Sequence, residues 1–570
     1  MTNEFTKEQC EPVFEAEQFS AEDRAALSPF FTNLDRSVYA PLIAAPELIG
    51  ALCSRASRAS KDLRAVYLNE FLMPFLRPVR GPKDTDADMA ERMRYGDMLT
   101  RYIEFTKRVP AAALFAHPKA RAFYDTWLAQ YGDDSIAQMA GTHLVFAGIS
   151  QVAVKHLEDQ RIGLAPIERS TRYVDFGNKV KGRYPYYTDP TLSVLGFTKE
   201  YEAVMDGLFE TYNRLLPRLE VFFAKKFPDE KPGVIKAKAF DTLRGLLPTS
   251  ALTQVAFFGN GQAFEYMISR SARHPVSEIR WVATRAYEEL VQVIPAFLRR
   301  LEKPVTKTYQ EYLASRGSRM GKLALALSNP IRVREGEGSS VKMLWHDPDG
   351  ENKILTAMLY DAAGSHGSWE EVGARVMGMP PEQKKALFAK YLEGRTERWQ
   401  RVGRAFEHAY ARFEILMNIG AWRDIHRHRM LTQQRQLFSC LHGHDVPPEV
   451  REAGMEKEFS DAVERVSAVW AKIAVHDRYA AQYAVTLSHR VRFVQFENMR
   501  QSFWQIELRT IPEGHPDYRK IEQEKFWLLA EVYPMITEHM RVNLSEYDFA
   551  RRGQEERIQQ KTQERAGGAQ

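Results

Sequence analysis

The stretch "DIHRHRMLTQQRQLFS" (residues 424–439) is the part of the sequence that decides how the chain is interpreted. Arg427, His428 and Arg429 stand side by side in it, directly after an apolar run. Three explanations compete for such a triplet: a solvated basic helix end, a metal site, or a site that binds an anion. Cations favour a helix C-terminus, so the triplet alone does not choose among them.

Nearby histidines and a cysteine make the metal explanation worth weighing. In a helix, residues two apart point about 200° from each other, so His426 and His428 cannot chelate one ion together there. An extended backbone would put Cys440, His442 and His444 on one face. The chain has 3 cysteines and no CxxC pattern. We therefore expect no metal site.

Composition sets the broad class of the protein. A chain of 570 residues is too long for one ordinary core, so two or more domains are expected. Its 44% hydrophobic residues are enough for sizeable cores, and its 27% charged residues are typical of a globular protein. The net charge of +5 is small beside 79 basic and 74 acidic residues, so we expect no nucleic-acid partner.

The same numbers bear on the compartment. Three scattered cysteines form no disulfide framework and fit a reducing, cytoplasmic location. The N-terminal stretch is acidic and polar, unlike a secretory signal. Since no segment approaches 18 uninterrupted apolar residues, we expect no membrane span.

Amphipathic helical patterns dominate the chain. Residues 278–302 predict one long helix, and residues 403–425 predict another, with Phe406, Tyr410 and Phe413 at helical spacing. Strand-like stretches are fewer: 183–189, 339–347 and 487–496, the last of which could also begin a helix.

Spacings recur between the two halves of the chain. Gln138 precedes Gln160 by 22 residues and Ser170 by 32, and Glu407 precedes Arg429 and Ser439 by the same intervals. Later, "NGQAFEYMISR" ends at Arg270 and "NMRQSFWQIELR" ends at Arg509, and each is soon followed by His-Pro. The ordered set predicts two diverged copies of one unit, with two unrelated helical domains as the alternative.

The repeat suggests four regions. They are an N-terminal copy (1–302), a connecting region (303–338), a C-terminal copy (339–548) and a polar tail (549–570) that we expect to be disordered.

The spacing of residues around the triplet resembles flavin-dependent thymidylate synthases. In that family a Glu-His pair lies about twenty residues before an Arg-His-Arg triplet. An Asn-x-Arg follows, and then another Arg nine residues later. Here Glu407 and His408 precede the triplet, and Asn498, Arg500 and Arg509 follow it at those intervals.

The N-terminal half supplies the piece that the C-terminal half lacks. "IERSTRYVDF" resembles the family's Glu-x-Ser-x-Arg-Tyr run, with Glu168, Ser170, Arg172 and Tyr173. In this half, "EDQ" (158–160) stands in place of the basic triplet. Two glycines, Gly259 and Gly261, stand in place of Asn498 and Arg500.

The C-terminal half departs from the family around Ser439. This serine follows the triplet by nine residues rather than seven, and "CLHGH" follows it instead of an Arg-Tyr run. Leu437 stands where a strict match needs Ser. These departures keep two alternatives open: flavin-dependent modification of another pyrimidine nucleotide, and a non-catalytic relative that only binds flavin or nucleotide.

The resemblance implies a helix-rich α/β fold of the α+β type and a reaction. That reaction is reductive methylation of deoxyuridylate (dUMP) at C5, with FAD as cofactor, methylenetetrahydrofolate as carbon donor and NADPH as reductant. Family members are homotetramers with sites between subunits. We therefore expect a homodimer of tandem chains that imitates the tetramer.

The resemblance also assigns residues to roles. The FAD-binding group is Glu407, Arg427, His428, Arg429, Asn498 and Arg500, since guanidinium groups suit phosphates. The nucleotide-binding group is Glu168, Ser170, Arg172 and Ser439. The expected catalytic residues are Arg270 and Arg509, which would polarise the pyrimidine carbonyl.

Structural explanations exist for each of these residues. Arg270 and Arg509 could be ion-pair partners of Glu278 and Glu507. The Glu168 run could be a capping arrangement. Glu407 needs a partner on its apolar face, and an arginine could satisfy it without any ligand.

Overall fold

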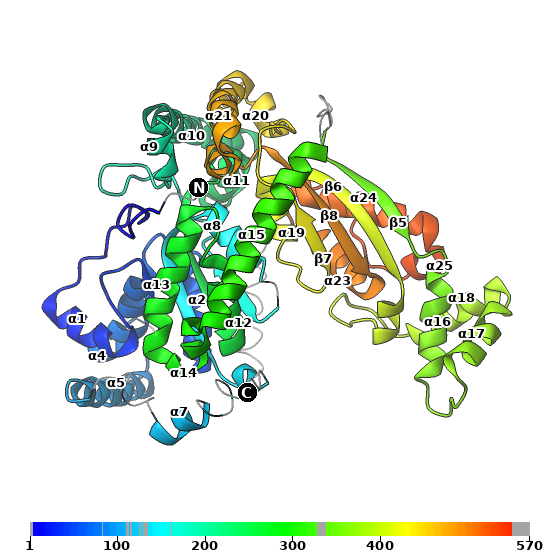
Figure 1. Cartoon of the computed structure of the whole chain (residues 1–570), viewed down its shortest axis with the longest axis horizontal. Coiled ribbons are helices and arrows are strands. Elements are labelled where there is room, and N and C mark those ends of the chain that lie inside the picture. The colour runs from blue at the N-terminus through cyan, green and yellow to red at the C-terminus, as the bar shows by residue number, and fades with distance from the viewer. Residues whose placement is uncertain are drawn as a thin grey trace. The chain divides into compact units, whose positions relative to one another are not determined.

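The computed structural model of the chain (Figure 1) describes residues 4–549, apart from residues 83, 110–112, 114–116, 125, 127, 129–134, 161 and 328–337. The chain groups into two compact units. The first unit combines Met1–Arg214, Leu247–Arg332 and Asp461–Val485. The second unit combines Leu215–Leu246, Val333–Ser460 and Thr486–Gln570.

The first unit contains one antiparallel sheet. Its strands are β1 (Val38–Tyr39), β2 (Gly141–Ser150), β3 (Leu164–Glu168) and β4 (Leu252–Asn260), in the order β1-β2-β4-β3. The central strands are buried along most of their length, which matches their nearly continuous apolar sequence. Between Phe146 and Ile149 the register shifts, because β2 carries one more residue than β4 there.

The second unit repeats this sheet. Its strands are β5 (Ser340–His346), β6 (Tyr410–Asn418), β7 (Thr432–Arg435) and β8 (Arg490–Asn498), in the order β5-β6-β8-β7. The order and the antiparallel pairing are those of the first sheet. The expected helix-rich α+β fold, built from two copies of one unit, is confirmed.

Helices make up most of the rest of each unit. The helices of the first unit are α1 (Ala21–Leu27), α2 (Pro46–Ala56), α3 (Leu63–Val66), α4 (Met73–Leu76), α5 (Asp86–Thr106), α7 (Pro118–Tyr124), α8 (Gln151–Glu158), α9 (Thr191–Val194), α12 (Gly261–Ser271), α13 (Ser277–Val293), α14 (Pro295–Leu298), α15 (Pro304–Leu327) and α22 (Arg478–Ala481). Those of the second unit are α11 (Pro232–Leu243), α16 (Gly350–Tyr360), α17 (Trp369–Met377), α18 (Pro381–Tyr391), α19 (Ile419–Ile425), α20 (Pro448–Glu452), α23 (Met499–Arg509), α24 (Pro516–Val532) and α25 (Pro534–Thr537). Two helices, α10 (Thr198–Lys226) and α21 (Glu456–His476), have residues in both units.

Short turns of tighter or wider helix connect these elements. They are η1 (Ser28–Phe30), η2 (Tyr67–Leu72), η4 (Ile136–Gln138), η5 (Arg244–Leu246), η6 (Arg299–Glu302), η7 (Arg404–His408) and η8 (Gln482–Ala484).

The two long strands of each sheet run directly into a helix through a capping side chain. Ser150 caps α8 and Asn260 caps α12, each accepting a hydrogen bond from the backbone N–H three residues on. Asn418 and Asn498 cap α19 and α23 in the same way. Ser and Asn are preferred caps because their side-chain oxygens satisfy an amide that the helix leaves unpaired. These four junctions fix how the two copies correspond.

The predicted helix over 403–425 is wrong in its centre. Residues 410–418 form β6, and only the flanks are helical, as η7 and α19. Ala411, Phe413 and Ile415 lie on the buried face with a period of two. The helical spacing of the aromatic residues was therefore a coincidence within a strand. The helix predicted over 278–302 is confirmed up to Val293, where α13 ends. Ile294 has a non-helical backbone, and α14 and η6 follow it as separate short elements.

Two of the three predicted strands are confirmed. Residues 339–347 and 487–496 contain β5 and the start of β8. Residues 183–189 form no strand and make only isolated bridges, Val180 with Arg183 and Tyr186 with Ala251. The predicted tail lies outside the described residues from residue 550 onward. Within the described part of the chain, no helix is long and apolar enough to cross a membrane.

Candidate functional site

The basic triplet lies just past the C-terminus of α19. This helix ends at Ile425, so the triplet follows the helix rather than continuing it. Its three side chains differ sharply in burial: Arg427 is exposed, His428 is only 2% exposed and Arg429 is half-buried. Arg427 lies 4.0 Å from Asp424, at the limit of an ion pair. The Arg427 guanidinium therefore lies at the surface, while the His428 ring belongs to the interior.

His428 contacts the arginine that ends α23. The Nε of Arg509 donates a hydrogen bond of 2.8 Å to Nε2 of His428. An arginine Nε always carries its hydrogen, so Nε2 of the histidine must be the acceptor. Burial and the charge of Arg509 hold the pKa of His428 well below its usual range. The ring is neutral and its one proton is on Nδ1.

The proton on Nδ1 requires an acceptor, and Gln501 supplies it. As drawn, Nε2 of Gln501 lies 3.2 Å from Nδ1, while Oε1 of the same amide is buried with no hydrogen-bond partner. Two donors cannot share one hydrogen bond, and the two ends of an amide are assigned from the surrounding network. The amide of Gln501 therefore takes the opposite orientation, with Oε1 accepting from Nδ1–H of His428. The amide of Gln505, 3.0 Å away, must turn with it, so that its Nε2 donates to Oε1 of Gln501.

A buried polar chain continues beyond Gln501. The amide of Gln501 lies 3.0 Å from that of Gln505, which reaches Glu522 at 2.6 Å. Glu522 and Glu497 flank the ammonium of Lys525, and all three are 0% exposed. Two carboxyls then share one buried cation. Burial raises the pKa of Glu522, which favours its protonated form.

Glu407 and Arg500 form the second contact of the site. Glu407 comes from η7 and Arg500 from the first turn of α23, and their side chains are 2.5 Å apart. Arg404 adds a weaker contact of 3.3 Å. Burial alone would raise the pKa of Glu407, but the hydrogen bonds from Arg500 and Arg404 lower it. Glu407 thus has the arginine partner that its position requires.

Asn498 has a structural role at this point. Its Oδ1 accepts the backbone N–H of Gln501 and so begins α23. The Asn-x-Arg spacing thereby fixes the helix start and puts Arg500 on its first turn. By the same cap, the counterpart of Asn498 in the first copy is Asn260, not Gly259 as the sequence alignment suggested, and Gln262 corresponds to Arg500.

The alignment of the triplet with residues 158–160 is also shifted by one. Because β2 contains one extra residue, each residue of the triplet corresponds to a residue of the first copy that lies one position later than the spacings suggested. Counted from the caps Ser150 and Asn418, the triplet corresponds to residues 159–161. Gln160 then takes the place of His428, and both of its side-chain polar atoms are buried without a hydrogen-bond partner. The third position, Arg161, lies outside the described residues.

In the first unit, Glu168 is a buried structural carboxylate. It is 6% exposed and contacts Lys155 at 3.1 Å, and it accepts a hydrogen bond of 2.6 Å from Gln151. Lys155 also pairs with Glu158 at 2.6 Å. A buried lysine between two carboxylates therefore occurs in both units.

The serine and arginine of the same run lie just beyond β3. Ser170 Oγ accepts from the backbone N–H of Arg172, and Ser170 N donates to Ser57 O. Arg270, at the end of α12, lies 3.8 Å from Asp159. The proposed ion pairs with Glu278 and Glu507 are wrong, because Glu278 binds Ser150 and Glu507 binds Arg395. In the second unit, Ser439 is half-buried beyond β7.

Gln501, Gln505, Glu522 and Lys525 were not singled out in the sequence. The signal available was Gln501 and Gln505 four apart in a helix, directly after the Asn-x-Arg. Such a pair normally marks a solvated face, so only the fold shows that it is buried. Among the described residues, no group of three or more His, Cys, Asp or Glu side chains could hold a metal ion.

Comparison with known proteins agrees with this arrangement. The sequence pattern of the family described as thymidylate synthase complementing protein matches residues 83–296 and again residues 342–535. The chain belongs to that family. The two matches show that it holds two copies of the family's unit in tandem.

Several relatives span nearly the whole chain. A UPF0159 protein of Chlamydia pneumoniae is 34% identical over 550 residues, which cover 95% of this chain and 98% of that protein. A UPF0159 protein of Thermoplasma acidophilum is 27% identical over 473 residues, 76% of this chain and 91% of its own. Among solved structures, a UMP/dUMP methylase, PolB, of Streptomyces cacaoi bound with 5-Br dUMP aligns with 37% of this chain and 100% of its own. Its sequence identity is 14% and its TM-score 0.29, too low to support an argument about the site.

Proposed function

We propose that this protein is an FAD-dependent enzyme that methylates dUMP at C5, using methylenetetrahydrofolate and NADPH. One observation supports this most directly. Residues at the family's spacings meet in space within the second unit, His428 with Arg509 and Glu407 with Arg500. Family membership supplies the reaction class.

The residues present are suited to FAD. Arg427 and Arg500 have side chains that are 43% and 38% exposed, and guanidinium groups form charge-assisted hydrogen bonds with a pyrophosphate. Four residues after Arg429, Gln433 has both side-chain polar atoms buried without a hydrogen-bond partner. A polar ligand would satisfy such an amide. When bound, FAD supplies the redox chemistry that takes a hydride from NADPH.

The nucleotide-binding roles follow from the resemblance. Arg509 is held through its Nε by His428, so its terminal nitrogens are directed by a fixed guanidinium plane. In the proposed site they donate to the pyrimidine carbonyl, where charge develops. Ser170 and Arg172 bind the phosphate. Counted from the caps Asn260 and Asn498, Ser271 is the counterpart of Arg509, and Arg270 lies one residue before it. Ser439 takes the place of the family serine.

A different pyrimidine nucleotide is the second candidate substrate. The observation that favours it is the altered segment around Ser439. This serine lies two residues beyond the family position, and the intervening Leu437 is 41% exposed. A longer segment with an exposed leucine changes the shape of a nucleotide pocket. Assay of dUMP beside UMP and dCMP separates the two candidates.

The first experiment is to record the visible spectrum of the purified protein with and without added FAD. We expect oxidised-flavin bands that shift when dUMP is added. The variant Arg427→Ala is expected to weaken FAD binding about 10- to 100-fold, because a hydrogen bond to a charged group contributes about 1.5–3 kcal/mol. Arg465→Ala, at an exposed position of α21, is the matched control and should bind FAD normally.

The outcomes divide cleanly. Bound flavin with transfer of a methyl group to dUMP supports the proposal. Bound flavin with no turnover on any pyrimidine nucleotide indicates a non-catalytic relative. Flavin retained at full affinity by Arg427→Ala would refute the assignment of the triplet to the cofactor.

A further inference from the structure

A cavity in the first unit is the strongest feature that the proposed function does not use. It has a volume of about 460 Å³, within the range of sites for small molecules. Its roof is the N-terminal segment Val13–Gln18, and its floor includes Ala147 and Gly148 of β2 and Gln254 of β4. The roof lies before residue 83, where the first family match begins. The segment that covers the cavity is therefore an addition to the family's unit, while its floor belongs to that unit.

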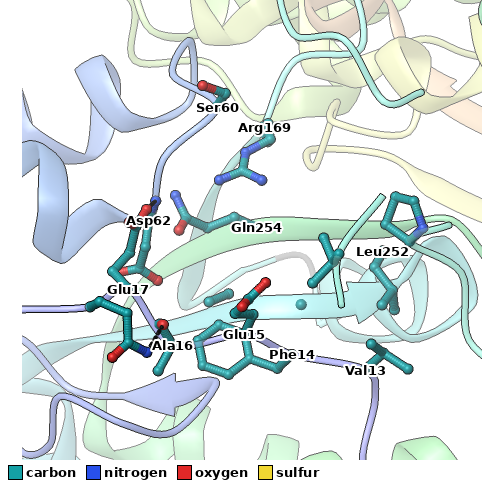
Figure 2. Close-up of a pocket in the computed structure, with 15 residues that line it drawn as sticks. Val13, Phe14, Glu15, Ala16, Glu17, Ser60, Asp62, Arg169, Leu252 and Gln254 are labelled. Atoms are coloured by element: carbon teal, nitrogen blue, oxygen red, sulfur yellow. Dashed lines mark hydrogen bonds between the residues drawn. The ribbon is translucent and has the colours of Figure 1, made fainter. Parts of the chain in front are cut away.

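The sheet side of the cavity offers hydrogen-bond donors. Arg169 uses one terminal nitrogen to donate to Lys61 O at 3.0 Å, while its Nε is buried and has no hydrogen-bond partner. The amide of Gln254 is oriented by Leu63, whose backbone N–H donates to its Oε1 at 3.1 Å. This leaves Nε2 of Gln254 as the donor on the other end. Figure 2 shows the Arg169 guanidinium directed into the cavity beside Gln254.

The roof offers acceptors instead. Glu15 and Glu17 both line the cavity. Figure 2 shows the exposed Glu15 carboxylate at the cavity, on the side opposite Arg169, and Glu17 accepts a hydrogen bond of 3.2 Å from the backbone N–H of Asp62. Asp62 also lines it, but this carboxylate is paired with Arg64 at 2.8 Å. Once that pair is set aside, two carboxylates face one guanidinium. The excess of negative charge disfavours phosphates, so the cavity does not suit a nucleotide.

A ligand that fits must present acceptors along one edge and donors along another. Guanine does so: its O6 and N7 accept from an arginine fork, and its N1–H and N2–H₂ donate in parallel to a carboxylate. Adenine presents an amino group where Arg169 requires an acceptor. The apolar side chains of Val13, Phe14 and Leu252 provide a surface for the flat ring.

We propose that this cavity binds a guanine nucleoside, with Arg169 and Gln254 on the carbonyl edge and Glu15 on the amino edge. This site lies entirely within the first unit. Arg169 stands between Glu168 and Ser170 of the proposed nucleotide-binding group, but guanosine binding and dUMP methylation are measured separately, so either proposal can fail without the other.

The test is calorimetric titration of the full-length protein with guanosine, inosine and adenosine, repeated with saturating FAD and dUMP. We expect saturable binding of one guanosine per chain. Inosine lacks the 2-amino group and should bind about tenfold more weakly or worse, and adenosine should not bind detectably. GMP should bind no better than guanosine, because its phosphate adds negative charge.

Two variants locate the site. Glu15→Gln and Arg169→Lys should each weaken guanosine binding at least tenfold. Glu8→Gln, at an exposed position in the same N-terminal region, should leave it unchanged. Glu15 is exposed at the surface, so its variant is not expected to impair folding. Three results would each overturn the proposal. They are no saturable binding of guanosine, binding of inosine and adenosine as tight as that of guanosine, or unchanged guanosine affinity in Glu15→Gln.

Discussion

A buried histidine that accepts a hydrogen bond from an arginine has one choice of tautomer. In His428 the choice is enforced from both sides, by Arg509 at Nε2 and by the Gln501 oxygen at Nδ1. The sequence and the family resemblance placed His428 and Arg509 in one site, but they gave no reason to connect them. The connection depends on how α19 and α23 end in space, which residue spacing along the chain does not encode.

The first prediction concerns this contact. His428→Leu removes the acceptor of a charged donor, a contact of about 1.5–3 kcal/mol, and frees the Arg509 guanidinium. We expect dUMP to bind about 10- to 100-fold more weakly, as measured by calorimetric titration. The control is His442→Leu, whose ring lies 3.1 Å from Gln436. Unchanged dUMP affinity would show that Arg509 does not meet the nucleotide.

The second prediction concerns Glu278, a completely buried residue of α13. It accepts hydrogen bonds of 2.8 Å from Ser150 N and from Tyr483 OH. Burial nevertheless raises its pKa to about 7 from an ordinary 4.5. The folded state therefore holds this proton more tightly than the unfolded state. The contribution of the protonated Glu278 carboxyl to the free energy of unfolding is complete below about pH 4.5 and is lost as pH rises through about 7.

The loss over that window is about 3 kcal/mol, since one pKa unit corresponds to about 1.36 kcal/mol. Glu278→Gln cannot ionise, so its free energy of unfolding should fall less between pH 5 and pH 8 than that of the unaltered protein. Urea denaturation at both pH values measures the difference. Parallel pH profiles for the two proteins would contradict the assignment.

At the scale of elements, the junctions between strand and helix organise each copy. Each of the four capped junctions turns a central strand into a helix. In the second copy, α23 ends at Arg509 and the basic triplet follows the end of α19. Alternating sequence predicted β5 and β8, because each shows polar and apolar residues in turn. The strand β6 was predicted as part of a helix, because its apolar residues fit both a helical and a strand period.

Polar residues on the inner faces were harder to predict for a physical reason. Gln495 and Glu497 alternate in β8 with residues that face outward, yet they are 0% exposed. A sequence reader assigns glutamine and glutamate to solvent, because burying them unpaired is costly. Here a mutual network gives one polar atom of each side chain a hydrogen-bond partner, Oε1 of Gln495 and Oε1 of Glu497, and only the three-dimensional arrangement shows that it exists.

The third prediction tests one junction. Asn418 caps α19 through Oδ1, and its Nδ2 donates to Asp445 at 3.0 Å and to Asp517 at 2.7 Å. Asn418→Ala removes the cap and leaves two carboxylates facing each other. We expect a loss of about 3 kcal/mol in the free energy of unfolding. Ser368→Ala, at the exposed cap of α17, is the control and should cost about 1 kcal/mol.

Denaturation with urea, followed by far-UV circular dichroism, compares the two cap variants directly. Equal losses in the free energy of unfolding for Asn418→Ala and Ser368→Ala would mean that the hydrogen bonds from Asn418 to Asp445 and Asp517 do not stabilise the fold.

At the scale of the molecule, the chain holds two copies that have lost different parts. The second copy keeps the basic triplet and the Asn-x-Arg, and the first keeps the Glu-x-Ser-x-Arg run. Family resemblance made this complementary pattern visible from the sequence. Each unit also has a buried lysine between two carboxylates, but Lys155 is in α8 and Lys525 is in α24, so the two clusters are not equivalent positions of the repeat.

The fourth prediction follows from the tandem arrangement. If sites of this family form between subunits, two tandem chains supply the four units of such an assembly. We expect a homodimer, with about twice the mass of a single chain by sedimentation equilibrium. A monomer that binds flavin and methylates dUMP would show that one chain is sufficient.

The additional residue in β2 has a consequence for the history of the chain. It shifts the correspondence so that Asp159, Gln160 and Arg161 stand where the second copy has Arg427, His428 and Arg429. The last of the three is already arginine in the sequence. Asp159→Arg with Gln160→His would therefore write the whole triplet back into the first copy. At these three positions the first copy differs from the second by only two residues.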